Sequence, residues 1–318
     1  MNNIEYKRLF SDQRNPVLAL IVVFLFTVAG VLLIGPVLGI GFTTLIYNID
    51  AMSLDRFLQQ PETFENGRKA LLLYQGASAL GAFLTPVLLY FSIYERKNPF
   101  ILLPIKGLED QMLVMAVLAT FSFMIVNTVF IEWNANMDLP GFLQPFEDWA
   151  KNMEDQLREV TEFLTKFDSV SYFLAAIVVV AIIPAIVEEL LFRGAIQNIF
   201  FQISKNHHLA IWLAAILFSA IHVQFYGFIP RVLLGALFGY LYVWSGNIWL
   251  AVLGHFVNNG ISLLVLYLYQ QDKISYDVES DESAPWYAIL PFLIIFIASM
   301  VFLYRHYKKL HGKVEESI

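Results

Sequence analysis

The stretch AIIPAIVEELLFRG, residues 181–194, places two glutamates and an arginine inside a long apolar segment that runs over residues 170–200. A helix needs about 20 predominantly apolar residues to cross the hydrocarbon core of a bilayer, so this segment is typical of a membrane-spanning helix. An ionisable side chain inside such a helix is costly and is by default a candidate for function. The stretch therefore indicates both the class of fold and the position of a site.

The composition of the whole chain agrees with this segment. Its 318 residues are 58% hydrophobic and only 15% charged, whereas soluble domains are about 45–50% apolar and about 25% charged. The surplus of apolar side chains predicts an all-α, polytopic membrane helix bundle that forms a single integral membrane domain over residues 1–318. Membrane lipid is therefore an expected partner.

Apolar runs predict about eight transmembrane helices and one amphipathic helix. The predicted spans are 17–47, 70–94, 111–133, 170–200, 208–223, 229–245, 247–269 and 286–304. The fifth and sixth are short and meet at residues 224–230, so a re-entrant pair is an alternative. The first apolar run is too long for the core of a cleaved signal peptide and is interpreted as a retained span, tilted or broken near Gly35 and Pro36.

The distribution of charge predicts the orientation. With eight spans and a cytoplasmic N-terminus, basic residues outnumber acidic ones in the inside segments, and acidic residues predominate outside. The inside basic residues are Lys7, Arg8, Arg14, Arg96, Lys97, Lys106, Lys205, Arg305, Lys308, Lys309 and Lys313. We therefore expect both termini to be cytoplasmic, in an inner or plasma membrane.

Charge and motif content also exclude several classes of function. The net charge of −7 and the lack of a Gly-rich phosphate loop argue against nucleic acid or nucleotide as a partner. The chain has no cysteine, which excludes disulfides, thiolate metal sites and a cysteine nucleophile.

The segment 140–168 has a different pattern. Apolar residues recur there at helical spacing with acidic residues between them: Phe146, Trp149, Ala150, Met153, Leu157, Val160 and Leu164. This pattern predicts an amphipathic helix that lies on the outer face of the bundle, with a substrate-gating lid as the alternative. The acidic stretch 272–282 is expected to be a solvated loop.

The first polar group of the candidate site lies in the fourth span. Glu189 and Arg193 are four residues apart on one helical face, with the acid first, and can form a buried ion pair that fixes helix packing. Glu188 is rotated about 100° from Glu189 and has no local partner. Pro184 cannot donate a backbone hydrogen bond to the carbonyl of Val180, so a kink there is expected to open the bundle beside Glu188.

The next two motifs lie further along the chain. His222 ends the fifth span in the pattern Phe218-x-x-x-His222, and could equally be an interfacial residue. His255 and Asn259 share one face of the seventh span, where a structural polar clamp between helices is the alternative. Together the three motifs predict a wet, polar pocket within the membrane.

Glu188-Glu189-x-x-x-Arg193, Phe218-x-x-x-His222 and His255-x-x-x-Asn259, in this order, resemble the signature of the CAAX-protease and bacteriocin-processing (CPBP, Abi) family. That family includes the type II CAAX prenyl endopeptidases. The resemblance covers residues 180–260, within a motif-bearing core of about 170–270. It implies hydrolysis of a peptide bond of a membrane-associated protein or peptide, with Glu188, Glu189, Arg193, His222, His255 and Asn259 as site residues.

The resemblance also implies roles for these residues. Glu188, with His222, would activate a water molecule, and His255 and Asn259 would stabilise the oxyanion. Glu189 and Arg193 would hold the helix and tune the charge of the site. Glu188, His222 and His255 could instead hold a divalent metal such as zinc, although the sequence has no H-E-x-x-H motif; metal-free and metal-dependent hydrolysis both stay open.

Two other functions remain as alternatives. A proton-coupled transporter could use the same ionisable residues as a relay, but no inverted repeat is visible. A non-catalytic bacteriocin-immunity protein could keep the fold and act by binding. The physiological substrate and the oligomeric state are not encoded in these motifs.

Overall fold

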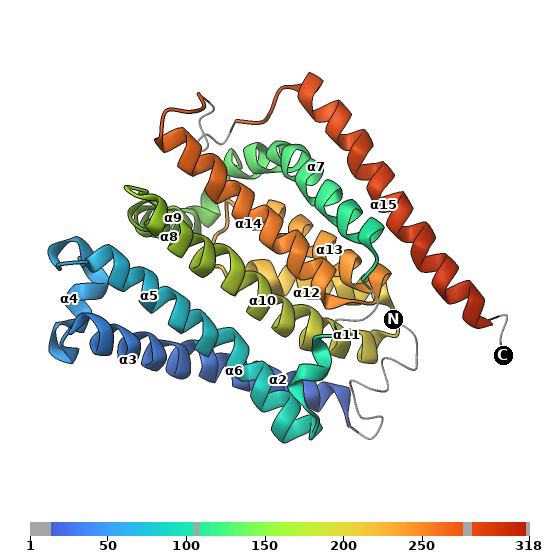
Figure 1. Cartoon of the computed structure of the whole chain (residues 1–318), viewed down its shortest axis with the longest axis horizontal. Helices are drawn as coiled ribbons and strands as arrows, with labels where there is room; N and C mark the ends of the chain where they lie inside the picture. Colours follow the sequence, from blue (N-terminus) through green and yellow to red (C-terminus); the bar gives the residue numbers. More distant parts are fainter. Residues whose placement is uncertain (1–13, 105–107, 276–281, 316–318) are drawn as a thin grey trace.

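The computed structural model describes residues 14–104, 108–275 and 282–315, and within these ranges every regular element is helical (Figure 1). The α-helices are α2 (Pro16–Ala29), α3 (Gly35–Tyr47), α4 (Leu54–Gln59), α5 (Gly67–Ala79), α6 (Thr85–Leu89), α7 (Asp110–Ala135), α8 (Gln144–Leu164), α9 (Val170–Ala176), α10 (Ile183–Glu189), α11 (Gln197–Ser204), α12 (His207–Ala220), α13 (Phe228–Ser245), α14 (Ile248–Gln270) and α15 (Trp286–Glu315). Wider π-helical turns join several of them: η1 (Gly30–Ile34), η4 (Leu80–Leu84), η5 (Tyr90–Glu95), η8 (Ile177–Ile182) and η9 (Leu190–Ile196). Short 3₁₀ turns are η2 (Ala51–Ser53), η3 (Pro61–Thr63), η6 (Pro99–Leu102) and η7 (Gly141–Leu143).

The predicted polytopic helix bundle is confirmed. Within the described residues, seven helical stretches are long and apolar enough to cross a membrane: Pro16–Tyr47, Gly67–Glu95, Asp110–Ala135, Val170–Ser204, Phe228–Ser245, Ile248–Gln270 and Trp286–Lys309. Large apolar side chains such as Phe24, Leu33 and Ile294 are exposed on these stretches. Apolar side chains on the surface suit lipid, and each helix satisfies its backbone hydrogen bonds internally, as a lipid-exposed segment must.

The fifth predicted span, 208–223, is not among these seven stretches, and the re-entrant pair considered for the fifth and sixth spans stays open. Helix α12 has only 14 residues, and at 1.5 Å per residue it is about 21 Å long, against about 30 Å for the hydrocarbon core. The helix ends at Ala220, and Val223 beyond it adopts a left-handed backbone with φ of 56°, which does not continue a right-handed helix. Helices α12 and α13 therefore form a hairpin, whose tip is residues 221–227.

Proline explains most of the π-helical turns. Pro36, Pro86 and Pro184 each lie at the second residue of the α-helix that follows a π-helical turn. A proline has no N–H to donate to the carbonyl four residues earlier, and its ring collides with that carbonyl. A wider turn removes the collision without ending the helix. The predicted break near Gly35 and Pro36 is this change of helical geometry.

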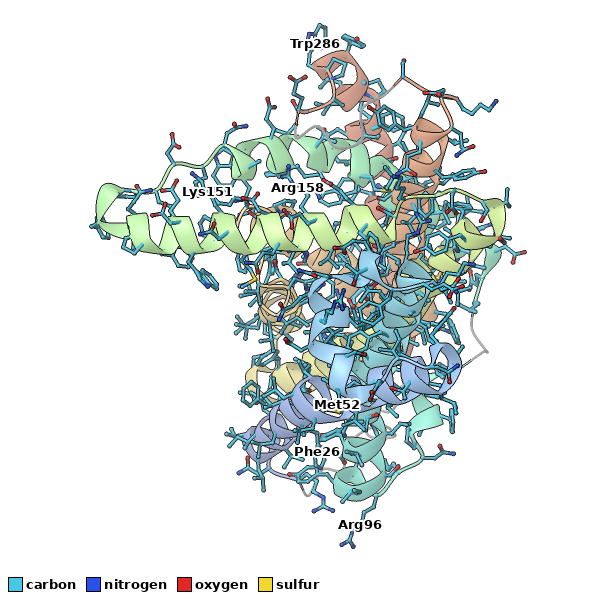
Figure 2. All side chains as sticks on the ribbon, turned by 90° about the vertical axis from the view of Figure 1, so that its left-hand side faces the viewer. Phe26, Met52, Arg96, Lys151, Arg158 and Trp286 are labelled. Atoms are coloured by element: carbon cyan, nitrogen blue, oxygen red, sulfur yellow. The ribbon has the colours of Figure 1, made fainter. Side chains whose placement is uncertain are left out.

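The amphipathic helix predicted at 140–168 is α8. Figure 2 shows it, with the labelled Lys151 and Arg158, lying across the other helices rather than along them. Phe146 contacts Phe225 with ring centroids 5.3 Å apart, and the Lys151 ammonium lies 5.8 Å from the ring centroid of Tyr226. Helix α8 therefore packs against the hairpin tip of α12 and α13.

The start of α2 and the end of α15 lie toward the same, lower-right end of the bundle in Figure 1. The side of the membrane on which each chain end lies stays a prediction. Lys7, Arg8 and Lys106, which contributed to that prediction, lie outside the described residues, as do the side chain of Lys313 and residues 276–281 of the predicted acidic loop.

Glycines allow the first two spans to touch through their backbones. A Cβ atom on Gly81 of η4 would lie 2.6 Å from the Cα of Gly35, and a Cβ on Gly35 would lie 2.7 Å from the carbonyl oxygen of Ser78. Neither position can hold a larger side chain at this separation. Small residues in this arrangement are the usual basis of close helix packing in membranes.

Candidate active site

Three neighbouring helical stretches carry the predicted site residues. Glu188 and Glu189 end α10, and Arg193 follows in η9, in which every residue is buried. His222 lies in the hairpin tip after α12. His255 and Asn259 lie one turn apart on α14. The structure brings these stretches together inside the bundle, as the sequence predicted.

Glu189 is the centre of the buried network. Its Oε2 lies 3.0 Å from Nε of Arg193, and both side chains are almost completely buried. Its Oε1 accepts a hydrogen bond from Nδ1 of His255 at 2.9 Å. The predicted Glu189–Arg193 ion pair is confirmed, whereas the contact with His255 was not predicted.

Arg193 has further partners that keep it in place. Its Nη2 donates to the carbonyl of Gly235 on α13 at 2.7 Å. Its guanidinium carbon lies 5.1 Å from the ring centroid of Phe218 and 5.8 Å from that of Phe238. A buried cation with a carboxylate, a carbonyl and two aromatic faces around it has a defined orientation.

His255 connects this network to Glu188. Because Nδ1 donates to Glu189, Nε2 is directed toward Glu188, whose Oε2 lies 4.0 Å away. The imidazole stacks on Phe238 at 5.2 Å between centroids and meets the edge of Phe218 at 6.0 Å. Glu188 is 8% exposed, so this carboxylate and the imidazole face each other in a buried setting.

Phe218, one turn before His222, packs against the polar side chains of the site. Its ring contacts His222 at 4.9 Å between centroids, in addition to Arg193 and His255. Nδ1 of His222 donates to the carbonyl of Phe218 at 2.7 Å, since a carbonyl can only accept. His222 therefore presents Nε2 as its free acceptor when the ring is neutral, and His255 interacts with it electrostatically.

Asn259 has a contact that differs from the prediction. Its Nδ2 donates to the carbonyl of Val180 at 3.2 Å, and its Oδ1 accepts from Nδ2 of Asn258 at 3.0 Å. One amide hydrogen of Asn259 is thus used for a backbone contact with the neighbouring span, and a second hydrogen remains.

Sequence reasoning missed Arg231. Its Nη2 donates to Oε1 of Gln224 at 2.6 Å, and it interacts electrostatically with Glu188, His222 and Glu154. Arg231 lies inside the predicted span 229–245, so the rule that marks ionisable residues in spans would have identified it.

Glu154 of α8 lies beside this arginine. Burial raises the pKa of its carboxyl group, while hydrogen bonds from the backbone N–H groups of Tyr226 and Gly227 and the charge of Arg231 oppose the shift. Helix α8 is thereby connected to the loop that carries His222.

The arrangement does not fit a metal centre. Among the residues that the structure describes, no group of three histidine, aspartate or glutamate side chains is close enough together to hold a metal ion. Glu188, His222 and His255, the set considered for zinc, do not form such a group. We therefore derive no step through a metal.

Comparisons with known proteins bear on the same region. Residues 170–261 match the family model of the Rce1-like type II CAAX prenyl endopeptidases, which confirms the resemblance carried by the three motifs. The chain is also 28% identical over 112 residues to the uncharacterized protein YpbD of Bacillus subtilis (strain 168); the match covers 33% of this chain and 54% of the relative, so it spans about half of that protein. No solved structure matches the chain.

Proposed function

We propose that this protein is an intramembrane endopeptidase that hydrolyses a peptide bond of a membrane-associated protein or peptide. The observation that carries the proposal is the opposition of Glu188 and His255 across 4.0 Å, in a buried site where Glu189 and Arg193 fix the histidine. The match of residues 170–261 to a prenyl endopeptidase family supports this chemistry.

Glu188 is the proposed general base. Its Oε2 and Nε2 of His255 are too far apart for a direct hydrogen bond, but a water molecule can contact both at about 2.8 Å. Glu188 removes a proton from this water, and the oxygen attacks the scissile carbonyl carbon. The electron pair of the carbonyl double bond moves to its oxygen, which becomes the oxyanion of a tetrahedral intermediate.

His255 and Asn259 are the proposed oxyanion donors. Nε2 of His255 donates when the ring carries its second proton, and the amide hydrogen of Asn259 that is not bonded to Val180 is the second donor. Donors fixed in advance are effective because they need no reorganisation as the charge develops. The Glu189–Arg193 pair holds His255 for this purpose.

Collapse of the intermediate completes the reaction. The oxyanion reforms the carbonyl, the carbon–nitrogen bond breaks, and Glu188 returns its proton to the leaving amine. The new carboxylic acid gives its remaining proton to the amine, and the products are a carboxylate and an ammonium group. Before the attack, Nε2 of His222 accepts a hydrogen bond from the second O–H of the water and holds the water in line.

The setting of the site limits the substrates. We place the protein in an inner or plasma membrane with both chain ends in the cytoplasm and the site open to the cytoplasmic side. A C-terminal peptide that carries a prenylated cysteine is the proposed substrate class, because its lipid holds it at the membrane. Nucleic acids and nucleotides have no role in this proposal.

The proposal is tested with purified protein in lipid nanodiscs. Two probes share one C-terminal sequence, and only one carries a farnesylated cysteine; cleavage products are identified by mass spectrometry. The expected result is cleavage of the farnesylated probe by the unaltered protein and none by Glu188→Gln. The control Glu95→Gln changes another buried glutamate, bonded to Tyr90, and keeps activity. Equal cleavage by Glu188→Gln contradicts the proposal.

A further inference from the structure

Pro184 interrupts the helical hydrogen bonding just before Glu188 and Glu189. It has no N–H, so the carbonyl of Val180, four residues earlier, receives no backbone donor from this position. The π-helical turn η8 ends two residues before it, and α10 begins with Ile183. Glu188 lies about one turn beyond the proline, so the direction of this short helix decides where its carboxylate points.

Asn259 supplies a donor to that same carbonyl. Its Nδ2 lies 3.2 Å from the oxygen of Val180. Asn258 donates to Oδ1 of Asn259 at 3.0 Å, which fixes the orientation of the Asn259 amide. In a bilayer the alternative for an unpaired carbonyl is hydrocarbon rather than water, so the side chain of Asn259 supplies a donor that the N–H-less Pro184 cannot.

Helix α14 therefore holds the fourth span at two points, one on each side of Pro184. Before the proline, Asn259 bonds to Val180; after it, His255 bonds to Glu189 at 2.9 Å. The two holding residues are one turn apart on α14. With both contacts made, α10 cannot rotate about the proline, and the 4.0 Å separation between Glu188 and His255 is fixed.

We infer that Asn259 is a positioning residue, which holds the bend at Pro184 through the carbonyl of Val180 and so directs Glu188 toward His255. This role is additional to any donation to an oxyanion. It rests on the proposed function only in what Glu188 does; the bond itself is tested without substrate.

A double-mutant cycle separates this role from others. Asn259→Ala removes the donor and lowers the melting temperature. Pro184→Ala provides a backbone N–H that can bond to Val180 in its place. The loss caused by Asn259→Ala is therefore smaller in the Pro184→Ala background than in the unaltered protein. The matched control is Asn127→Ala, which removes a similar bond from a buried asparagine to the carbonyl of Pro230; its loss is the same in both backgrounds.

Kinetics provide a readout that a purely structural role does not change. With the farnesylated probe, Asn259→Ala and Pro184→Ala each lower kcat, because Glu188 is misdirected, and leave KM unchanged. The double variant regains thermal stability but not kcat. If the unaltered protein cleaves no probe, the proposed function fails, and the melting temperatures still decide the role of Asn259.

The result that overturns the inference is additivity of the two substitutions in melting temperature. If Asn259→Ala does not fold, the cycle uses folded yield in detergent, with Asn259→Asp as the second variant, since an ionised carboxylate cannot donate to a carbonyl. Pro184→Ala then raises the yield of both variants. Equal yields with and without Pro184→Ala overturn the inference as well.

Discussion

The two adjacent glutamates of α10 have different surroundings, and their replacement should have different effects. Glu189 pairs with both Arg193 and His255, whereas Glu188 has one neighbour at 4.0 Å. We expect Glu188→Gln to abolish turnover with an unchanged or raised melting temperature, because no close partner is lost. Glu189→Gln should lower the melting temperature, since it leaves Arg193 buried without its counter-charge.

Measurement of both melting temperature and peptide cleavage in the same preparation checks this pair of variants. A Glu188→Gln protein that is inactive only because it unfolds would show that its carboxylate is structural. The reverse pattern, in which Glu189→Gln folds normally and alone loses activity, would exchange the assigned roles.

Arg193 allows a second test at the residue scale. Its removal strands the buried charge of Glu189, which typically costs about 3–5 kcal/mol. Arg193→Ala should therefore unfold at a markedly lower temperature and lose activity. Arg193→Lys keeps the charge but not the planar guanidinium between Phe218 and Phe238, so it should recover part of the stability. A normal melting curve for the alanine variant would contradict the importance of the pair.

Much of the candidate site was predictable from the sequence because helical spacing and the cost of intramembrane charge both act locally. The Glu189–Arg193 pair follows from residues four apart, and the structure confirms it. The bonds from His255 to Glu189 and from Asn259 to Val180 were not predictable, because they depend on the rotation of two helices about their axes. That rotation is determined by packing across the bundle.

At the scale of elements, α8 packs against the hairpin tip of α12 and α13. The backbone of Tyr226 and Gly227, in the loop that carries His222, and the charge of Arg231 oppose the rise that burial causes in the pKa of Glu154. We expect Glu154→Ala to loosen this loop and to reduce cleavage several-fold. Glu159→Ala, at an exposed position of the same helix, is the control and should have no effect. If the two variants cleave the same probe at equal rates, α8 does not influence the site.

The sequence left two roles open for α8, a helix on the outer face of the bundle and a substrate-gating lid, and the contacts with the hairpin tip bear on both. The spacing of its apolar residues predicted the helix correctly, because amphipathic periodicity is local. Its packing against Phe225, in the predicted junction 224–230, was not predictable, since the spacing of residues in α8 does not determine which loop the helix meets. The length of α12 was overestimated because hydropathy continues through Val223, whereas the backbone turns there.

At the scale of the whole molecule, the orientation in the membrane is a prediction that the lack of cysteine makes simple to test. Phe142, before α8, and Phe100, between α6 and α7, are 80% and 70% exposed. We expect a membrane-impermeant maleimide to label Phe142→Cys in intact cells, and Phe100→Cys only after permeabilisation. Labelling of the two in the opposite order would invert the orientation, and labelling of both in intact cells would change the number of crossings.

Composition predicts which helices can cross a membrane, but it does not predict which of them pack together. Apolar length identified the seven helices that are long enough to cross a membrane, because a helix in lipid must satisfy its own backbone hydrogen bonds. The pairing of spans was not predictable. Gly35 and Gly81 come together only because two distant helices present small residues at the same depth.

This glycine contact has a consequence for biosynthesis. The helices that carry Gly35 and Gly81 leave the ribosome before any of the spans that carry the candidate site. Their backbone contact requires no residue from the later spans, so the pair can associate in the bilayer while translation continues. Each later helix is then inserted beside a partner that is already in position.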